Sequence, residues 1–162
     1  MSTYTTQLRY LIENEFIDAD FECYKNIEPL IENLEIFSAA EEAGLIGNAI
    51  MGGTPKHRVF KKILRAMPKS IKENADYGPN IKTGPVFMAR TLTFDEIYVF
   101  SPHYFFPTKP GYRSERGLSE LYPDAYANHH WAGSWVEVEE RKNWAEWSQK
   151  YKKRKTWDKV IK

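Results

Sequence analysis

Five stretches of the chain carry apolar residues at the three- and four-residue spacing of a helix, and we expect each to be helical. They are residues 5–14, 27–34, 54–67, 83–92 and 136–155. The pattern is strongest in 54–67, where Thr54 suits an N-cap and Pro55 suits the first helical position. One face of this segment carries Val59, Phe60, Ile63, Leu64 and Met67. The sequence therefore predicts an amphipathic helix here.

Extended segments alternate with these helices. The expected strands are residues 15–22, 35–40, 44–53 and 96–102, and residues 126–135 are also expected to be extended. The third strand is apolar and bounded by glycines, which indicates a buried strand with close backbone contacts at both ends. Strands that alternate with helices are typical of an α/β domain.

Length and composition indicate one domain. The 162 residues are 42% hydrophobic, enough for a single core. We expect one α/β domain over residues 1–136 and a basic amphipathic helix or tail over residues 137–162. The segment from Lys150 onward carries seven cationic side chains and one aspartate. A solvated helical tail is the simpler interpretation, and contact with an anionic lipid surface is the alternative.

The overall charge and the cysteine content narrow the class of protein. A net charge of +1 gives no general attraction to nucleic acid, so no nucleic-acid partner is expected. Cys23 is the only cysteine, which leaves no disulfide framework and no thiolate metal cluster, and we expect it to be a small buried residue in a strand. There is no signal peptide and no apolar run approaching the ~18 residues of a membrane span. The expected location is the cytoplasm, at most peripheral to a membrane through the basic tail.

The first candidate for chemistry is the acidic pair Asp18 and Asp20, which follows the apolar residues Phe16 and Ile17. In an extended segment, residues two apart point to the same side, so the two carboxylates converge while Ala19 turns away. Carboxylates this close repel each other unless they are solvated or a cation lies between them. Their hard oxygen atoms suit Mg²⁺ or Mn²⁺, especially when substrate phosphates supply further ligands. The same pattern also occurs on solvated loops that bind no metal.

The second candidate is the segment NHHWAGSW, residues 128–135. Adjacent residues of a strand face opposite ways, so we expect only one of His129 and His130 to reach a shared site. Ser134 is able to donate a hydrogen bond to a phosphate, and Trp135 to cover a sugar or base. Packing of the tryptophans in a core is the alternative interpretation. The chain has no phosphate-binding loop, dinucleotide-binding fingerprint, H-E-x-x-H motif or C-x-x-C motif.

Four blocks together resemble the DXD-containing sugar transferases of glycosyltransferase family thirty-two, which is related to bacterial toxin glucosyltransferases. They are FIDADFECYKNIEPLI, GNAIMGGTPKHRVFKKIL, KTGPVFMARTL and YANHHWAGSW, and they occur in the family's order between residues 16 and 135. The resemblance implies a GT-A fold, a UDP- or GDP-sugar donor, a glycan or other hydroxyl acceptor, and transfer with retention of the anomeric configuration. It also implies a divalent metal, Mn²⁺ or Mg²⁺.

The resemblance assigns roles to individual residues. Asp18 and Asp20 hold the metal and contact the donor, and they are the catalytic residues. His130, in the element HWAG, is similar to a metal-ligating histidine of related enzymes, and the resemblance therefore favours it over His129. Donor contacts are implied for Arg9, Asn48, Ser134 and Trp135. The metal would stabilise the charge that develops on the leaving diphosphate.

The start of the chain departs from the family pattern. Family members carry several nucleotide-binding strands before the acidic pair, whereas 17 residues precede Asp18 here. Thr6 stands where the family has an aspartate, and Phe16 where it has a tyrosine. The resemblance thus implies an N-terminally truncated, partial GT-A fold, whose missing half is absent, rebuilt, or supplied by a second copy or a companion chain.

Three hypotheses follow for the function. The first is a metal-dependent glycosyltransferase involved in polysaccharide synthesis. The second is a non-catalytic remnant, or a module of the same fold that binds carbohydrate or nucleotide sugar. The third is a metal-dependent phosphohydrolase, which fits the carboxylates but leaves the HHWAGSW segment without a role.

Overall fold

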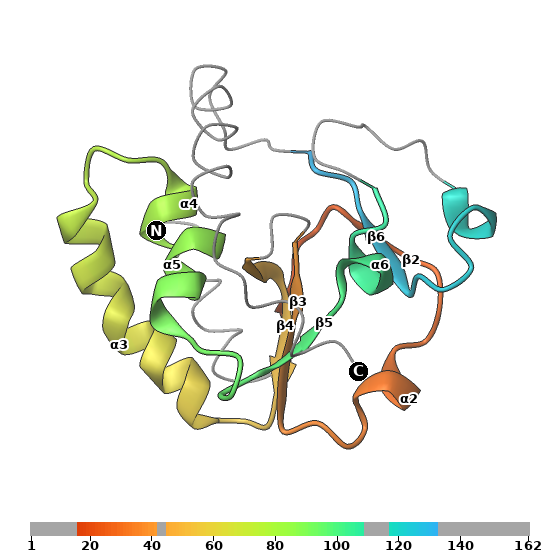
Figure 1. The fold of residues 1–162 in the computed structure, drawn as a ribbon, viewed down its shortest axis with the longest axis horizontal. Helices are drawn as coiled ribbons and strands as arrows, with labels where there is room; N and C mark the ends of the chain where they lie inside the picture. Colours follow the sequence, from red (N-terminus) through yellow and green to blue (C-terminus); the bar gives the residue numbers. More distant parts are fainter. Residues whose placement is uncertain (1–15, 42–44, 109–116, 133–162) are drawn as a thin grey trace.

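The computed structural model describes residues 16–41, 45–108 and 117–132, which form a mixed α/β fold (Figure 1). The expected helices at residues 5–14 and 136–155 lie outside the described residues, as does the basic tail. None of the helices in the described ranges has the length and apolar character that a membrane span requires.

The main sheet has four strands in the order β1-β4-β3-β5. Their bounds are Phe16–Ile17 for β1, Ile46–Gly53 for β4, Ile36–Ala40 for β3 and Tyr98–Phe100 for β5. Strand β4 runs antiparallel to both β1 and β3, whereas β5 is parallel to β3. The strands expected at residues 35–40, 44–53 and 96–102 are thereby confirmed, with small changes at their ends.

A second sheet pairs β2, Phe21–Cys23, with β6, Ala127–His129. The pairing is antiparallel, with Phe21 opposite His129 and Cys23 opposite Ala127. Cys23 is exposed, so the expectation of a buried cysteine was wrong. Among the residues that the structure describes, β2 pairs only with β6.

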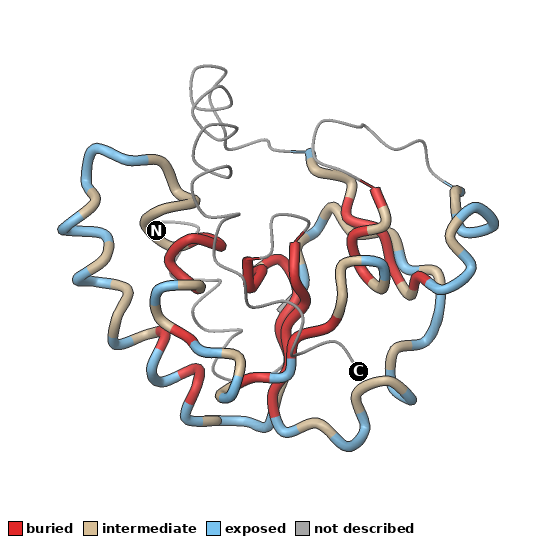
Figure 2. The backbone as a smooth tube through the Cα atoms, in the orientation of Figure 1, coloured by how far each residue is buried: buried red, intermediate tan, exposed pale blue. Residues whose placement is uncertain are grey.

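Both faces of the main sheet are covered, and β3 is buried along its whole length (Figure 2). Successive side chains of a strand point to opposite faces, so Ile36 packs into one core cluster and Phe37 into another. In β5, Val99 and Phe100 divide in the same way. The sheet therefore separates two apolar layers.

Short and long helices complete the two layers (Figure 1). Their bounds are Glu28–Ile31 for α2, Arg58–Glu73 for α3, Pro79–Lys82 for α4, Pro85–Thr91 for α5, Pro102–Phe105 for α6 and Leu118–Glu120 for the 3₁₀ turn η1. The longest helix, α3, packs with α5 on one face of the sheet. Apolar residues of α2, α6 and the second sheet pack on the other face. The segments expected to be helical at 27–34 and 83–92 contain α2 and α5, as predicted.

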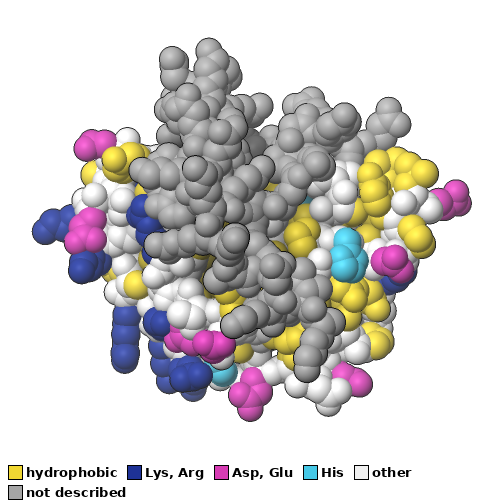
Figure 3. Space-filling model, in the orientation of Figure 1, with side chains coloured by type: hydrophobic (Ala, Val, Ile, Leu, Met, Phe, Trp, Pro, Cys, Tyr) yellow, Lys and Arg dark blue, Asp and Glu magenta, His cyan; other side chains and the backbone are white. Residues whose placement is uncertain are grey.

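Helix α3 is amphipathic, as its sequence predicts. Val59, Phe60 and Ile63 are buried against the sheet. Lysine and arginine side chains gather on the molecular surface over this helix (Figure 3). Burial of the apolar face against the sheet, more than intrinsic helix propensity, stabilises such a helix.

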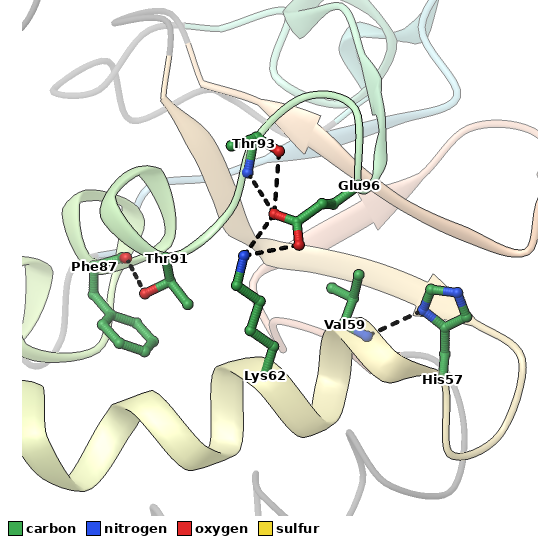
Figure 4. Close-up of polar contacts among 7 residues, drawn as sticks. All are labelled: His57, Val59, Lys62, Phe87, Thr91, Thr93 and Glu96. Atoms are coloured by element: carbon green, nitrogen blue, oxygen red, sulfur yellow. Dashed lines mark hydrogen bonds and ion pairs between the residues drawn. The ribbon is translucent and has the colours of Figure 1, made fainter.

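The start of α3 differs from the prediction. The helix begins at Arg58, and the N-cap is His57, whose Nδ1 accepts a hydrogen bond from the Val59 N–H (Figure 4). Thr54 belongs instead to a turn, because its N–H donates to the Glu35 carbonyl and its carbonyl accepts from the His57 N–H. The expected N-cap Thr54 and first helical residue Pro55 were therefore wrong. The tertiary hydrogen bond to Glu35 fixes Thr54 at the end of the sheet, and the helix starts only after the chain has turned.

Candidate metal site

The acidic pair lies on the turn that joins the two sheets. Strand β1 ends at Ile17, and the Asp18 N–H donates to the Ala49 carbonyl of β4 at 2.8 Å. The turn closes through a hydrogen bond from the Phe21 N–H to the Asp18 carbonyl, and β2 starts at Phe21. The two carboxylates are thus anchored to the main sheet on one side and to the second sheet on the other.

Asp20 holds the end of β6 in place through three contacts. Its Oδ2 accepts a hydrogen bond from the Ala132 N–H at 2.9 Å, and its backbone carbonyl accepts one from the His130 N–H at 2.9 Å. Its Oδ1 lies 3.0 Å from Nε2 of His129. Asp20 therefore supports the local fold as well as offering a carboxylate.

His129 is held mainly by aromatic packing. Its ring stacks on Phe21 and meets the rings of Phe106 and Trp131 edge-on. Its Nδ1 is buried and has no hydrogen-bond partner among the described residues, so the ring is fixed by this packing and by the contact of Nε2 with Asp20. Burial lowers the pKa of His129, and the neighbouring Asp20 carboxylate offsets this only in part. The ring is therefore kept neutral near physiological pH, which is the form that binds metals.

Asp18, Asp20 and His129 together could hold a divalent cation. Each offers one ligand atom, and these atoms lie within 4.8 Å of one another. His129 Nε2 lies 3.0 Å from Asp20 Oδ1 and 4.0 Å from Asp18 Oδ2. Ligands about 2.0–2.2 Å from an ion are about 3 Å apart when adjacent and about 4 Å apart when opposite, so these separations suit Mg²⁺ or Mn²⁺. Two carboxylates and an imidazole are a donor set that such ions accept.

The Asp18 carboxyl also has the electrostatics of a metal ligand. Burial, and next the negative charge of Asp20, raise its pKa to about 6. A carboxylate pair that repels in this way is relieved by a bound cation. The negative charge of Asp18 is therefore disfavoured in the metal-free site.

His130, which the family resemblance favours as the ligand, does not join the two aspartates. Its Nε2 lies 3.2 Å from Oε2 of Glu22. The two histidines face different partners, as expected for adjacent residues at a strand end. The pairing of Phe21 with His129 decides which of them meets the acidic turn.

The backbone at Trp131 is strained. Its φ is 53°, in the left-handed region that bulky residues rarely adopt. Two hydrogen bonds hold this conformation, one from the Trp131 indole N–H to the Thr108 carbonyl at 2.8 Å and the other from Ala132 to Asp20. The Thr108 hydroxyl also donates to the fully buried Asn128 at 2.7 Å. Thr108 therefore holds both Asn128, directly before His129, and Trp131, two residues after it. Backbone strain that is maintained by such contacts is typical of functional sites.

A third carboxyl group, that of Glu41, is buried near the acidic turn. Glu41 directly follows β3 and is only 6% exposed. A Cβ atom added to Gly47 of β4 would lie 2.8 Å from the Ala39 carbonyl oxygen and 3.3 Å from Cγ of Glu41, so the strand backbone, more than the Glu41 side chain, requires a glycine here. Burial, with a further contribution from the charge of Asp18, raises the pKa of Glu41 to about 8. The carboxyl group is thus mostly protonated at neutral pH.

Replacement of Glu41 by Gln is expected to stabilise the protein at high pH only. Because the folded-state pKa lies above the usual 4.5, the contribution of this group to stability is complete below pH 4.5 and is lost as the pH rises through about 8. Glu41→Gln cannot ionise, so we expect it to match the wild type at pH 5 and to exceed it by about 1–3 kcal/mol at pH 8. Chemical denaturation at both pH values measures this difference. Glu120→Gln, at an exposed position, is the control, and an equal effect of Glu41→Gln at both pH values would contradict the assignment.

Of the other residues predicted for the site, only Asn48 lies in the part of the chain that the structure describes. Asn48 is half-buried in β4, directly before Ala49, whose carbonyl binds the acidic turn. The β3–β4 pairing shifts register between Ser38 and Ala40, and such an irregularity next to a site is common. The predicted donor contacts Arg9, Ser134 and Trp135 lie outside the described residues.

Comparison of the chain with protein-family models, with curated proteins and with solved structures finds no match.

Proposed function

We propose that this chain is a metal-dependent glycosyltransferase, or the catalytic part of one, with a GT-A-like fold. It would transfer a sugar from a UDP- or GDP-sugar to a hydroxyl group of a glycan or another acceptor, with retention, in the cytoplasm. The observation that carries the proposal is the convergence of Asp18, Asp20 and His129 on one point, from a turn and a strand that are far apart in sequence. The mixed α/β layout is compatible with such a fold.

Each of the three side chains has a defined part in this proposal. Asp18 and Asp20 would hold Mn²⁺ or Mg²⁺, which supplies Lewis-acid stabilisation of the diphosphate leaving group. His129 would complete the protein ligands as a neutral imidazole. Asp20 would in addition keep the segment from His130 to Ala132 against the site, because it accepts hydrogen bonds from the backbone N–H groups of His130 and Ala132.

Donor binding is proposed for four further residues. Asn48 lies beside the acidic turn along β4 and would contact the transferred sugar. Arg9, Ser134 and Trp135 would contact the nucleotide and the diphosphate. A second copy of this chain or a companion chain would supply further contacts with the base of the donor.

The test is hydrolysis of nucleotide sugars without an acceptor. Water can replace the acceptor hydroxyl, so a working transferase should slowly release nucleoside diphosphate and free sugar from a UDP- or GDP-sugar in the presence of Mn²⁺. We expect release to stop on addition of EDTA and to return with excess Mn²⁺. A panel of UDP- and GDP-sugars, analysed by ion-exchange chromatography, measures both products.

The result of this assay also distinguishes the glycosyltransferase from the binding module and from the phosphohydrolase. Binding of a nucleotide sugar without turnover would favour the binding module over the enzyme. Release of inorganic phosphate from simple phosphate esters, with no release from nucleotide sugars, would favour the phosphohydrolase. Absence of both binding and turnover by the folded protein would contradict the proposed function.

A further inference from the structure

The outer face of α3 carries a row of positive charge, here called the basic stripe. It consists of Arg58, Lys61, Lys62, Arg65, Lys69 and Lys72. At about 100° per residue, all six fall within an arc of about 100° around the helix axis. The buried residues Val59, Phe60 and Ile63 lie on the opposite side. The basic stripe therefore points straight away from the core.

The stripe is long, exposed and only partly neutralised. All six side chains are exposed, and with a rise of about 1.5 Å per residue they extend over about 21 Å. Lys62 pairs with Glu96 at 2.7 Å (Figure 4), and Lys69 lies 3.7 Å from Glu73. The other four have no acidic partner within the part of the chain that the structure describes. Glu73 is the single acidic residue of α3, so the face keeps a strong positive charge.

The stripe is separate from the candidate metal site. Helix α3 belongs to the apolar layer on one face of the sheet, whereas Phe21 and Trp131, which flank His129, belong to the layer on the other face. The stripe and the candidate metal site therefore lie on different sides of the main sheet. A partner of the stripe would be a different anion from the donor proposed for the metal site.

The shape and composition of the stripe favour a flat partner. The cations follow a helix on the outside of the molecule (Figures 1 and 3), and an open depression there is lined by Arg58, Lys61, Lys62, Arg65 and Ala66. Sites for single-stranded nucleic acid combine a charged groove with aromatic side chains on which the bases stack. The six stripe residues include no aromatic side chain, and the aromatic residue within α3, Phe60, is buried. Long-range attraction between many cations and a charged plane requires neither a groove nor stacking.

We propose that the basic stripe docks the protein on a membrane surface rich in anionic lipid. Basic side chains close to such a surface bind it additively, and a helix that lies in the plane of the surface presents all of them at once. The attraction acts within about one Debye length and is weakened by salt. Docking through α3 would hold the protein at the membrane while the acidic turn, in the other layer, stays accessible.

The experiment is flotation of the full chain with lipid vesicles. We expect binding to vesicles that contain phosphatidylserine, no binding to pure phosphatidylcholine, and loss of binding as NaCl rises from about 0.05 to about 0.5 M. Arg65→Glu should weaken binding about tenfold or more, since it removes one favourable charge and adds one unfavourable charge. Lys25→Glu causes the same change in net charge in the other layer, and it should change binding less than about threefold.

Several outcomes would overturn the proposal. One is equal binding to charged and neutral vesicles. Another is an equal loss of vesicle binding in Arg65→Glu and in Lys25→Glu. A third is binding that survives Arg65→Glu but is lost in the tail variant Lys152→Glu with Lys153→Glu, which would assign docking to the tail. Tighter binding to duplex DNA than to anionic vesicles, also dependent on Arg65, would identify nucleic acid as the partner instead.

Discussion

Replacing Asp18 by Asn is expected to abolish both metal-linked stabilisation and turnover. In the wild type, Mn²⁺ with UDP or GDP should raise the melting temperature, because a ligand that binds only the native state stabilises it. Asn keeps the shape of Asp18 but removes the charge that the cation requires. We therefore expect no melting shift in Asp18→Asn, and release of nucleoside diphosphate about 10²–10³-fold slower than in the wild type.

Without metal, the Asp18→Asn substitution should not lower the stability of the protein. Because the folded-state pKa of Asp18 is raised from 3.8 to about 6, the charged form is disfavoured, and its contribution to stability is lost as the pH rises through about 6. At pH 8, metal-free Asp18→Asn should therefore be as stable as the wild type or more stable, by on the order of 1 kcal/mol. A loss of function through misfolding is thus distinguishable from a loss of the ligand.

Asp20→Asn provides an informative comparison. Both carboxylate oxygens of Asp20 are engaged, one by Ala132 and the other by His129, and an amide keeps only one acceptor. We expect Asp20→Asn to lose the metal response as well, and also to lose about 1 kcal/mol of stability without metal. Asp124→Asn, an exposed aspartate with the same chemical change, is the control for both variants. Equal melting shifts in the wild type and Asp18→Asn would rule out the proposed metal site.

Replacing Phe105 by Ala is expected to cost about 3–5 kcal/mol of unfolding free energy, the range for truncating a buried phenylalanine. Phe105 is 0% exposed and packs edge-on against Phe100, 5.5 Å between ring centroids. The same core cluster contains Phe106, whose ring meets that of His129. The cavity left by the truncated Phe105 side chain would therefore lie in the apolar layer that supports the candidate site.

Thermal and chemical denaturation measure this loss. For a chain of this length the expected free-energy change lowers the melting temperature by about 6–20 °C. Leu121→Ala is the control, because Leu121 is 69% exposed and its truncation should change stability by less than about 0.5 kcal/mol. A loss below about 1 kcal/mol in Phe105→Ala would mean that this layer is not packed as described.

The elements that the sequence predicted well are those with a clear apolar period. The amphipathic pattern of residues 54–67 located α3, and the glycine-bounded apolar run located β4. The start of α3 was not predictable from local signals, because Thr54 is held by a hydrogen bond to Glu35, nineteen positions earlier in the chain. Local capping preferences do not contain that contact.

The candidate site was predictable only in part. The carboxylates of Asp18 and Asp20 converge, but on a turn and not in the extended segment from which their convergence was predicted. Strand alternation indicated that one histidine joins them. Which histidine it is depends on the register between β2 and β6, and no local pattern specifies a register between segments about a hundred residues apart.

Glu41 was missed, although a signal existed. Alternation along β3 places position 41 on the same face as Phe37 and Ala39, which marks this glutamate as a candidate for burial. The role of Thr108 had no such signal, because a threonine in a sequence segment rich in proline and glycine resembles many solvent-facing residues. Its partners Asn128 and Trp131 became evident only from the folded arrangement.

The position of the acidic turn between two sheets also has a consequence for how the protein is made. A chain leaves the ribosome from its N-terminus, so Asp18 and Asp20 emerge early, whereas His129 and Ala132 emerge more than a hundred residues later. The three candidate ligand side chains can meet only after β6 has been synthesised and paired with β2. Contacts of such high sequence separation form slowly. The candidate metal site therefore cannot form before β6 has been synthesised, and nascent chains that end before β6 lack it.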